Sequence, residues 1–137
     1  MYNKIAFLGC GKIGQKMLSY INTREDCSVS FIQDPFLDPE KVPGIPVIKE
    51  PDAALLAETD LVIECATASV LKANAEEILK NADLLMFSVT AYQDAEFQAS
   101  VEKWCAAYGH HVYLPHGAIL GIDGIYDSRP LLKSVVI

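Results

Sequence analysis

The chain has 137 residues, of which 51% are hydrophobic and 21% charged, a composition that supports one globular domain with a buried core. Its formal net charge of −7 argues against nucleic acid or an anionic membrane surface as a partner. The sequence lacks both an apolar stretch as long as a membrane span and the features of a secretory signal, so we expect a cytoplasmic protein that binds no membrane.

The first predicted strand, residues 4–8, leads directly into a glycine-rich turn, which a helix predicted over residues 15–21 follows. The turn reads Gly9-Cys10-Gly11-Lys12-Ile13-Gly14. A strand, a G-x-G-x-x-G turn and a helix in this order form the dinucleotide-binding fingerprint. The alternative is a glycine-rich turn of some other α/β protein.

The three glycines of this turn have separate expected roles. Gly9 permits the tight turn, Gly11 lets a pyrophosphate approach the backbone, and Gly14 lets the helix pack closely on the strand. Backbone N–H groups at the helix start then bind the diphosphate, which adds Lys12 and Ile13 to the candidate cofactor-binding residues.

A second predicted strand, residues 29–33, ends directly before Asp34. A carboxylate at this position accepts hydrogen bonds from the hydroxyls of an adenine ribose and repels a 2′-phosphate. No Arg or Lys follows Asp34 before Lys41. The sequence therefore favours NAD over NADP as the cofactor. The alternative is that Asp34 merely opens a turn before Pro35.

The rest of the chain alternates strands with helices after an irregular, proline-rich stretch at 35–46. Strands are predicted at 46–48, 61–65, 84–88 and 112–114, and helices at 52–58, 68–80 and 94–108. Strands that are apolar throughout and alternate with helices indicate a parallel sheet covered on both faces. We therefore predict an α/β, doubly wound parallel sheet of the Rossmann type over residues 1–132, with strand order 3-2-1-4-5-6.

Ligands of such a sheet bind beyond the carboxyl ends of the strands. Small residues follow the predicted strand at 61–65 and leave room for the adenosine–diphosphate part of the cofactor. The candidates there are Cys65, Ala66 and Thr67, and Ser88 follows the next strand. Helix capping explains Thr67 and Ser88 equally well.

The segment 115–121 is expected near the nicotinamide, because Ala118 and the two glycines of the segment, Gly117 and Gly121, let the backbone approach a flat ring. His116 reads more readily as a solvent-facing loop residue than as a catalytic one. The four cysteines form no C-x-x-C pair and are expected to be buried or half-buried thiols of a reduced protein: Cys10, Cys27, Cys65 and Cys105. No spacing predicts a metal site.

Three segments carry a family resemblance: residues 9–14, Val62-Ile63-Glu64-Cys65-Ala66, and Gly117-Ala118-Ile119-Leu120-Gly121-Ile122-Asp123-Gly124-Ile125. They resemble the L-aspartate dehydrogenase family, and the amino-terminal half is similar to the wider homoserine-dehydrogenase-like NAD-binding group. The resemblance implies that Ala118 contacts NAD on the nicotinamide side. Two departures, Leu120 in place of a glycine and His116 in place of a frequent serine, lie at the expected substrate end.

The resemblance also implies a second domain, because members of that family are nearly twice as long. That domain supplies the substrate pocket, the catalytic histidine and the oligomer interface, so no catalytic residue is predicted in this chain. Residues 133–137 would be its first residues. The implied reaction converts L-aspartate and NAD to iminoaspartate and NADH, and we expect this chain alone to bind NAD weakly and catalyse nothing. Two alternatives stay open: a stand-alone NAD-sensing module, and a dehydrogenase domain for homoserine or another small acid.

Overall fold

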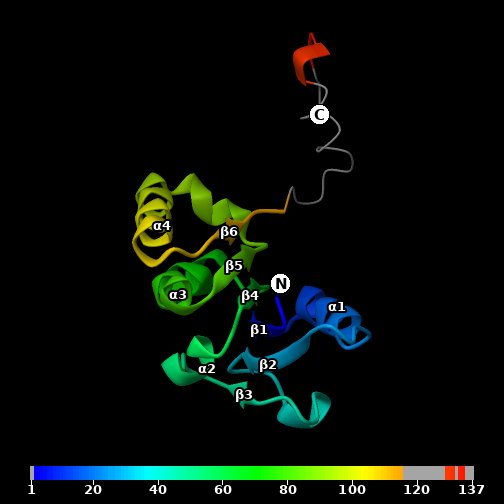
Figure 1. The fold of residues 1–137 in the computed structure, drawn as a ribbon. Coiled ribbons are helices and arrows are strands. Elements are labelled where there is room, and N and C mark those ends of the chain that lie inside the picture. Colours follow the sequence, from blue (N-terminus) through cyan, green and yellow to red (C-terminus); the bar gives the residue numbers. More distant parts are fainter. Residues whose placement is uncertain (1, 116–128, 132, 135–137) are drawn as a thin grey trace.

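The computed structural model describes residues 2–115, 129–131 and 133–134, and its centre is a six-stranded parallel sheet (Figure 1). The strand order is β3-β2-β1-β4-β5-β6, which confirms the predicted Rossmann order. The strands are β1 (Lys4–Leu8), β2 (Ser28–Gln33), β3 (Val47–Ile48), β4 (Leu61–Glu64), β5 (Asp83–Met86) and β6 (Val112–Tyr113).

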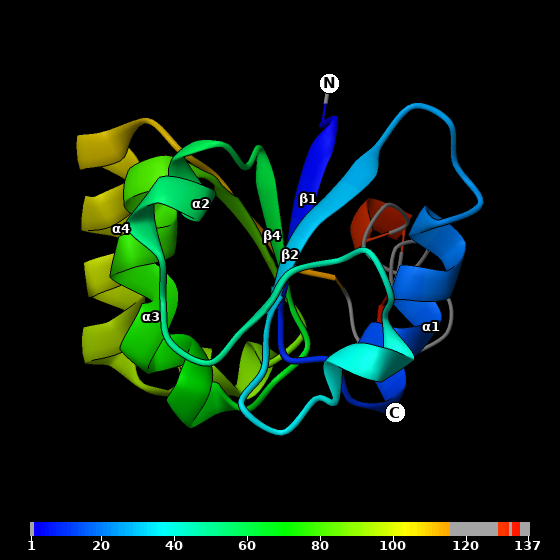
Figure 2. The same cartoon turned by 90° about the horizontal axis from the view of Figure 1, so that it is seen from below.

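Helices cover both faces of the sheet. Figure 2 shows α1 (Lys12–Ile21) on one side and α2 (Ala53–Ala57), α3 (Ala68–Asn81) and α4 (Ala95–Tyr108) on the other. Three short 3₁₀ helices complete the described elements: η1 (Pro39–Lys41), η2 (Val89–Gln93) and η3 (Arg129–Leu131). None of the described helices is long and apolar enough to cross a membrane.

The apolar strands are buried because each face of the sheet packs against a helix layer. In β1, Ala6 and Leu8 join the core beneath α3 and α4, whereas Ile5 and Phe7 join the core beneath α1. Alternate residues of a strand point to opposite faces, so a strand covered on both sides is apolar at every position. The neighbouring residues Ala6 and Phe7 point to opposite faces of the sheet, and both are 0% exposed.

Side-chain caps begin three of the described α-helices, as Ser, Thr, Asn and Asp do at N-cap positions. The Asp52 carboxylate accepts from Ala54 N and Leu55 N in α2, and the Asp94 carboxylate accepts from Glu96 N and Phe97 N in α4. Thr67 caps α3 by accepting from Val70 N at 3.4 Å. Gly109 ends α4 with a φ of +76°, the left-handed conformation that glycine adopts without strain.

Several predicted boundaries were wrong. Helix α1 begins at Lys12 and not at Gln15, so the last three residues of the glycine motif form the first helical turn. The fifth strand spans 83–86 and not 84–88, because Ser88 N turns to donate to the side chain of Glu64. The stretch 35–46 is irregular as predicted, apart from the short helix η1.

Candidate cofactor-binding site

The three glycines of the turn that follows β1 differ in the space around them. A Cβ on Gly9, whose φ is +85°, would lie 2.8 Å from the Ala66 Cβ, and a Cβ on Gly14 would lie 2.9 Å from the Gly9 carbonyl oxygen. Both contacts are shorter than real Cβ atoms tolerate, so these two glycines let strand, helix and the Ala66 backbone approach one another. A Cβ on Gly11 would meet nothing within 4 Å, so the space beside this residue is open.

The start of α1 offers backbone donors to a ligand. Gly11 is the N-cap residue, has no side chain to accept from the first turn, and no acidic residue follows in that turn. The first N–H groups of a helix lack partners within the helix and attract an anion. The open side of Gly11 and these donors fit the diphosphate of a dinucleotide.

Asp34 lies at the carboxyl end of β2, where both of its carboxylate oxygens accept hydrogen bonds. Oδ2 accepts from Cys10 N at 2.8 Å, and Oδ1 accepts from Phe36 N at 2.9 Å. Each carboxylate oxygen has a second lone pair, so the residue can still accept from ribose hydroxyls. Asp34 therefore fixes the glycine turn and the loop after β2 as well as facing the ligand space.

A cavity of about 560 Å³ lies along the carboxyl edge of the sheet, within the size range of small-molecule pockets. It gathers six of the predicted cofactor residues: Gly9, Gly11, Asp34, Cys65, Ala66 and Thr67. Lys12, Ile13, Gly14 and Ser88 are outside its lining. Ala118 and His116 lie outside the described residues.

Glu64 is a residue of the site whose role sequence reasoning missed. It ends β4 with 0% exposure, and its carboxylate accepts from Ala66 N at 2.7 Å, Ser88 N at 2.9 Å and Ser88 Oγ at 2.9 Å. One buried carboxylate thus joins the loops that follow β4 and β5. The Ser88 side chain is held by this bond and does not cap η2, which removes the capping interpretation for Ser88. The only advance signal was a charged residue within an otherwise apolar strand.

Cys65 lines the cavity, Cys10 is buried beside it in the glycine turn, and neither thiol serves as a nucleophile. Burial raises the pKa of the Cys10 thiol, and the charge of Asp34 adds to this effect. Burial, followed by the charge of Glu64, raises the pKa of Cys65 to about 12. Both thiols are therefore protonated at neutral pH, and only a thiolate is an effective nucleophile. All four cysteines are free and buried or half-buried, as predicted.

Lys49 is a cation that lines the cavity, although the sequence has no Arg or Lys between Asp34 and Lys41. Strand β3 pairs in parallel with β2, so that Ile48 is the partner of Gln33 and Asp34 N donates to Ile48 O at 2.9 Å. The residues after both strands therefore meet at one edge, and Lys49 lines the same cavity as Asp34. The register of β3 against β2 would have revealed this neighbour.

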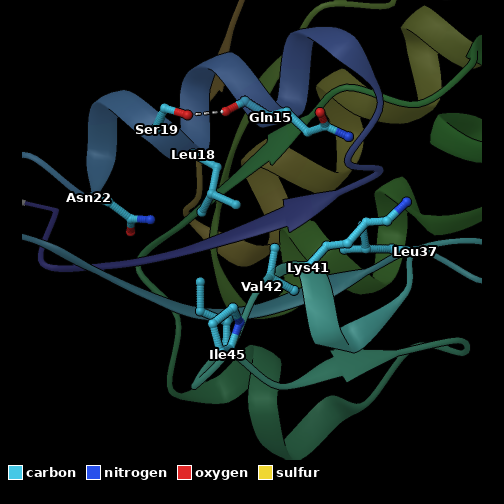
Figure 3. Close-up of a pocket in the computed structure, with 9 residues that line it drawn as sticks. Gln15, Leu18, Ser19, Asn22, Leu37, Lys41, Val42 and Ile45 are labelled. Atoms are coloured by element: carbon cyan, nitrogen blue, oxygen red, sulfur yellow. Dashed lines mark hydrogen bonds between the residues drawn. The ribbon is translucent and has the colours of Figure 1, made fainter.

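A second, smaller hollow of about 390 Å³ lies between α1 and the segment 37–45 (Figure 3). Leu18 points from α1 toward Val42 and Ile45, while Lys41 lies on the opposite wall. None of the predicted cofactor residues lines this hollow. The chemistry that the sequence indicates is therefore concentrated in the larger cavity.

Comparisons with known proteins show the family of this chain. Residues 9–115 match the family described as "Homoserine dehydrogenase, NAD binding domain". An L-aspartate dehydrogenase of Archaeoglobus fulgidus is 30% identical over 134 residues, which cover 97% of this chain and 54% of that enzyme. The chain thus spans about half the length of the curated relatives it matches.

Solved structures share the fold. The aspartate dehydrogenase of Thermotoga maritima superposes with a TM-score of 0.74 at 24% identity, over 95% of this chain and 52% of that chain. A Thermus thermophilus dehydrogenase in complex with NAD and alpha-ketoglutarate also reaches 0.74, at 16% identity, over 97% of this chain and 48% of that one. The chain therefore belongs to the family of homoserine dehydrogenase NAD-binding domains, and its predicted cofactor, NAD, is confirmed.

Proposed function

We propose that this chain is the cofactor-binding part of an enzyme that oxidises L-aspartate with NAD, giving iminoaspartate and NADH. The observation that carries the proposal is the alignment of 97% of the chain with an L-aspartate dehydrogenase, together with a cavity lined by the glycine turn and Asp34. The alternative of a stand-alone sensing module has no comparable support.

Within this proposal, different residues around the cavity bind different parts of the dinucleotide. Gly9, Gly11 and Gly14, with the N–H groups of Lys12 and Ile13, hold the diphosphate at the start of α1. Asp34 accepts from the hydroxyls of the adenine ribose. The backbone of the β4 loop, Cys65 to Thr67, forms the opposite wall.

The nicotinamide end is assigned to two further residues. Ser88, fixed by Glu64, faces the nicotinamide ribose, and Ala118 contacts the ring side as the family resemblance implies. Bound NAD supplies the hydride acceptor, C4 of its nicotinamide ring. The chain's own groups bind and orient the dinucleotide, and we assign none of the described side chains to accept the amine proton.

We further propose a division at residue 132, with residues 133–137 opening the part that completes the substrate site. The chain covers about half of its relatives, so the aspartate pocket and the general base are assigned to the uncovered half. On this basis the 137-residue chain binds NAD but does not turn over aspartate.

Calorimetric titration of the chain with NAD and NADP tests the proposal. We expect saturable NAD binding that weakens in Asp34→Ala, and weaker NADP binding because the Asp34 carboxylate repels a 2′-phosphate. The Lys49→Ala variant measures how far its ammonium group offsets that repulsion. Asp26→Ala is the matched control, since Asp26 pairs with Arg24 on the surface. Failure of the chain to bind NAD would contradict the assigned site, and turnover of aspartate by it would contradict the assignment of the base elsewhere.

A further inference from the structure

We propose that Phe36 is the residue on which the adenine ring stacks, an inference that rests on the proposed binding of NAD. The Phe36 side chain is 94% exposed, more than any other large hydrophobic side chain that the structure describes, and it lines the cavity at the carboxyl edge. Leaving an aromatic ring in water is unfavourable, and apolar surface beside a cavity is typical of a binding site.

The backbone fixes Phe36 next to the proposed ribose-binding acid. Its N–H donates to Asp34 Oδ1 at 2.9 Å, and Pro35, whose ring restricts φ, lies between the two residues. The base and the hydroxyls of a nucleoside are attached to the same ribose ring. A side chain that contacts the base must therefore lie near the carboxylate that binds the hydroxyls, which is where Phe36 lies.

Helix α3 contributes two apolar residues and Asn74 to the cavity wall. Val70, 39% exposed, and Ala73 line it, and Pro51 lines the cavity from the loop after β3. The glycine turn and the residues 65–67 occupy the part of the lining assigned to the diphosphate. The part between Phe36 and Val70 is left for a flat group with apolar faces, and an adenine ring has that shape.

The same part of the cavity carries a polar pair. Gln33 Nε2 donates to Asn74 Oδ1 at 3.1 Å, and Asn74 Nδ2 donates to Val70 O at 2.8 Å. The side-chain oxygen of Gln33, Oε1, takes part in none of the hydrogen bonds among the described residues, so it can accept from the amino group on the edge of adenine. Apolar faces with a polar edge favour a nucleobase over a purely apolar peptide segment.

The test compares nucleotide binding by the full 137-residue chain with that of Phe36 variants. Phe36→Ala is expected to weaken binding of both NAD and ADP-ribose by about tenfold, because stacking of a base on an aromatic ring contributes to affinity. The substitution keeps the backbone N–H that donates to Asp34. Phe36→Tyr keeps a stacking ring and is expected to bind as the wild type does. Tyr20→Ala, which removes another exposed aromatic ring from α1, is the matched control.

A spectroscopic readout separates stacking from a general loss of structure. In the Phe36→Trp variant, ADP-ribose is expected to quench the fluorescence of the introduced indole. Equal affinity of Phe36→Ala and wild type for both nucleotides, or no quenching in a variant that binds ADP-ribose, would overturn the stacking inference while NAD binding stands. If wild type binds neither nucleotide, the proposed function itself fails and takes this inference with it.

Discussion

The two ends of the parallel strands use the same chemical device with different results. At the amino ends, Asp60 accepts from Asn3 N and Lys4 N, and Asp83 accepts from His111 N and from the Tyr2 hydroxyl. At the carboxyl ends, Asp34 and Glu64 accept from backbone N–H groups of neighbouring loops in the same way. In all four cases, one carboxylate bridges segments that lie far apart in the sequence.

The difference lies in the residues around the carboxylates. Of these four carboxylates only Asp34 lines the cavity at the carboxyl edge, beside Gly9 and Gly11, while Glu64 precedes the lining residue Cys65. Carboxylate bridges alone order the strand ends of a sheet. At the carboxyl ends the glycine turn also leaves open space beside Gly11, and that space is available to a ligand. Variants at the amino ends should therefore change the free energy of unfolding but not nucleotide affinity. At the carboxyl ends, some variants should change the free energy of unfolding and others nucleotide affinity.

The largest loss of stability is expected at Glu64. Glu64→Ala leaves the half-buried Ala66 N–H and the two donors of Ser88 without an acceptor, and should lower the free energy of unfolding by about 3 kcal/mol. Glu64→Gln, which keeps the side-chain shape and one acceptor oxygen, should lose less. Urea denaturation followed by circular dichroism measures both, and an alanine variant as stable as wild type would contradict the proposed bridge.

Two glycines of one motif should separate folding from binding. Gly14→Ala places a Cβ against the Gly9 carbonyl oxygen and should cost about 2 kcal/mol of stability through overpacking. Gly11→Ala meets open space, so its stability should change by less than about 1 kcal/mol. Its Cβ should nevertheless hinder the diphosphate and weaken NAD binding by about tenfold or more. Thermal unfolding and NAD titration of both variants measure the separation, and a Gly11→Ala variant with unchanged affinity would argue against a diphosphate at this turn.

At the amino ends, Asp83→Asn should reduce stability in a pH-dependent way. Burial alone would raise the pKa of Asp83, but hydrogen bonds from the Tyr2 hydroxyl and His111 N outweigh it and hold the pKa below its usual value. The folded state therefore favours the ionised form, so this contribution is fully present above the unfolded pKa, near 4, and is lost as the pH falls through the lower folded value.

The free energy of unfolding of the wild type should accordingly exceed that of Asp83→Asn by about 1–2 kcal/mol at pH 7. The difference should shrink as the pH falls below 4. Urea denaturation of both proteins at a series of pH values measures the difference. A gap that widens in acid would reverse the sign and contradict the assignment. NAD affinity at pH 7 should be the same in both.

The smallest effect is expected at Asp60, an exposed carboxylate. Hydrogen bonds from Lys4 N and Asn3 N lower its pKa, but water competes for both donors. Asp60→Asn should therefore lower stability by only about 0.5 kcal/mol, and NAD binding should not change. Chemical denaturation of Asp60→Asn and Asp83→Asn compares their losses of stability. A larger loss in Asp60→Asn would mean that burial does not decide the strength of these bridges.

The sequence was sufficient for features with a local cause. The glycine turn and the acid after the second strand are each recognisable within a few residues, and the strand order follows from the alternation of strands with helices. The missed features depend on residues that only folding brings together. Glu64 and Ser88 are 24 positions apart, and Lys49 reaches the cavity through the pairing of β3 with β2.

The bridge made by Glu64 has a consequence for local opening of the molecule. The loops after β4 and β5 share one buried acceptor, so neither can detach without leaving a charge or a donor unpaired. The amide protons of Ala66 and Ser88 should therefore exchange with deuterium at similar, slow rates, as members of one cooperative unit. A nucleotide that orders one of these loops would then slow exchange in the other, although the two are separated by the whole of α3 in the chain.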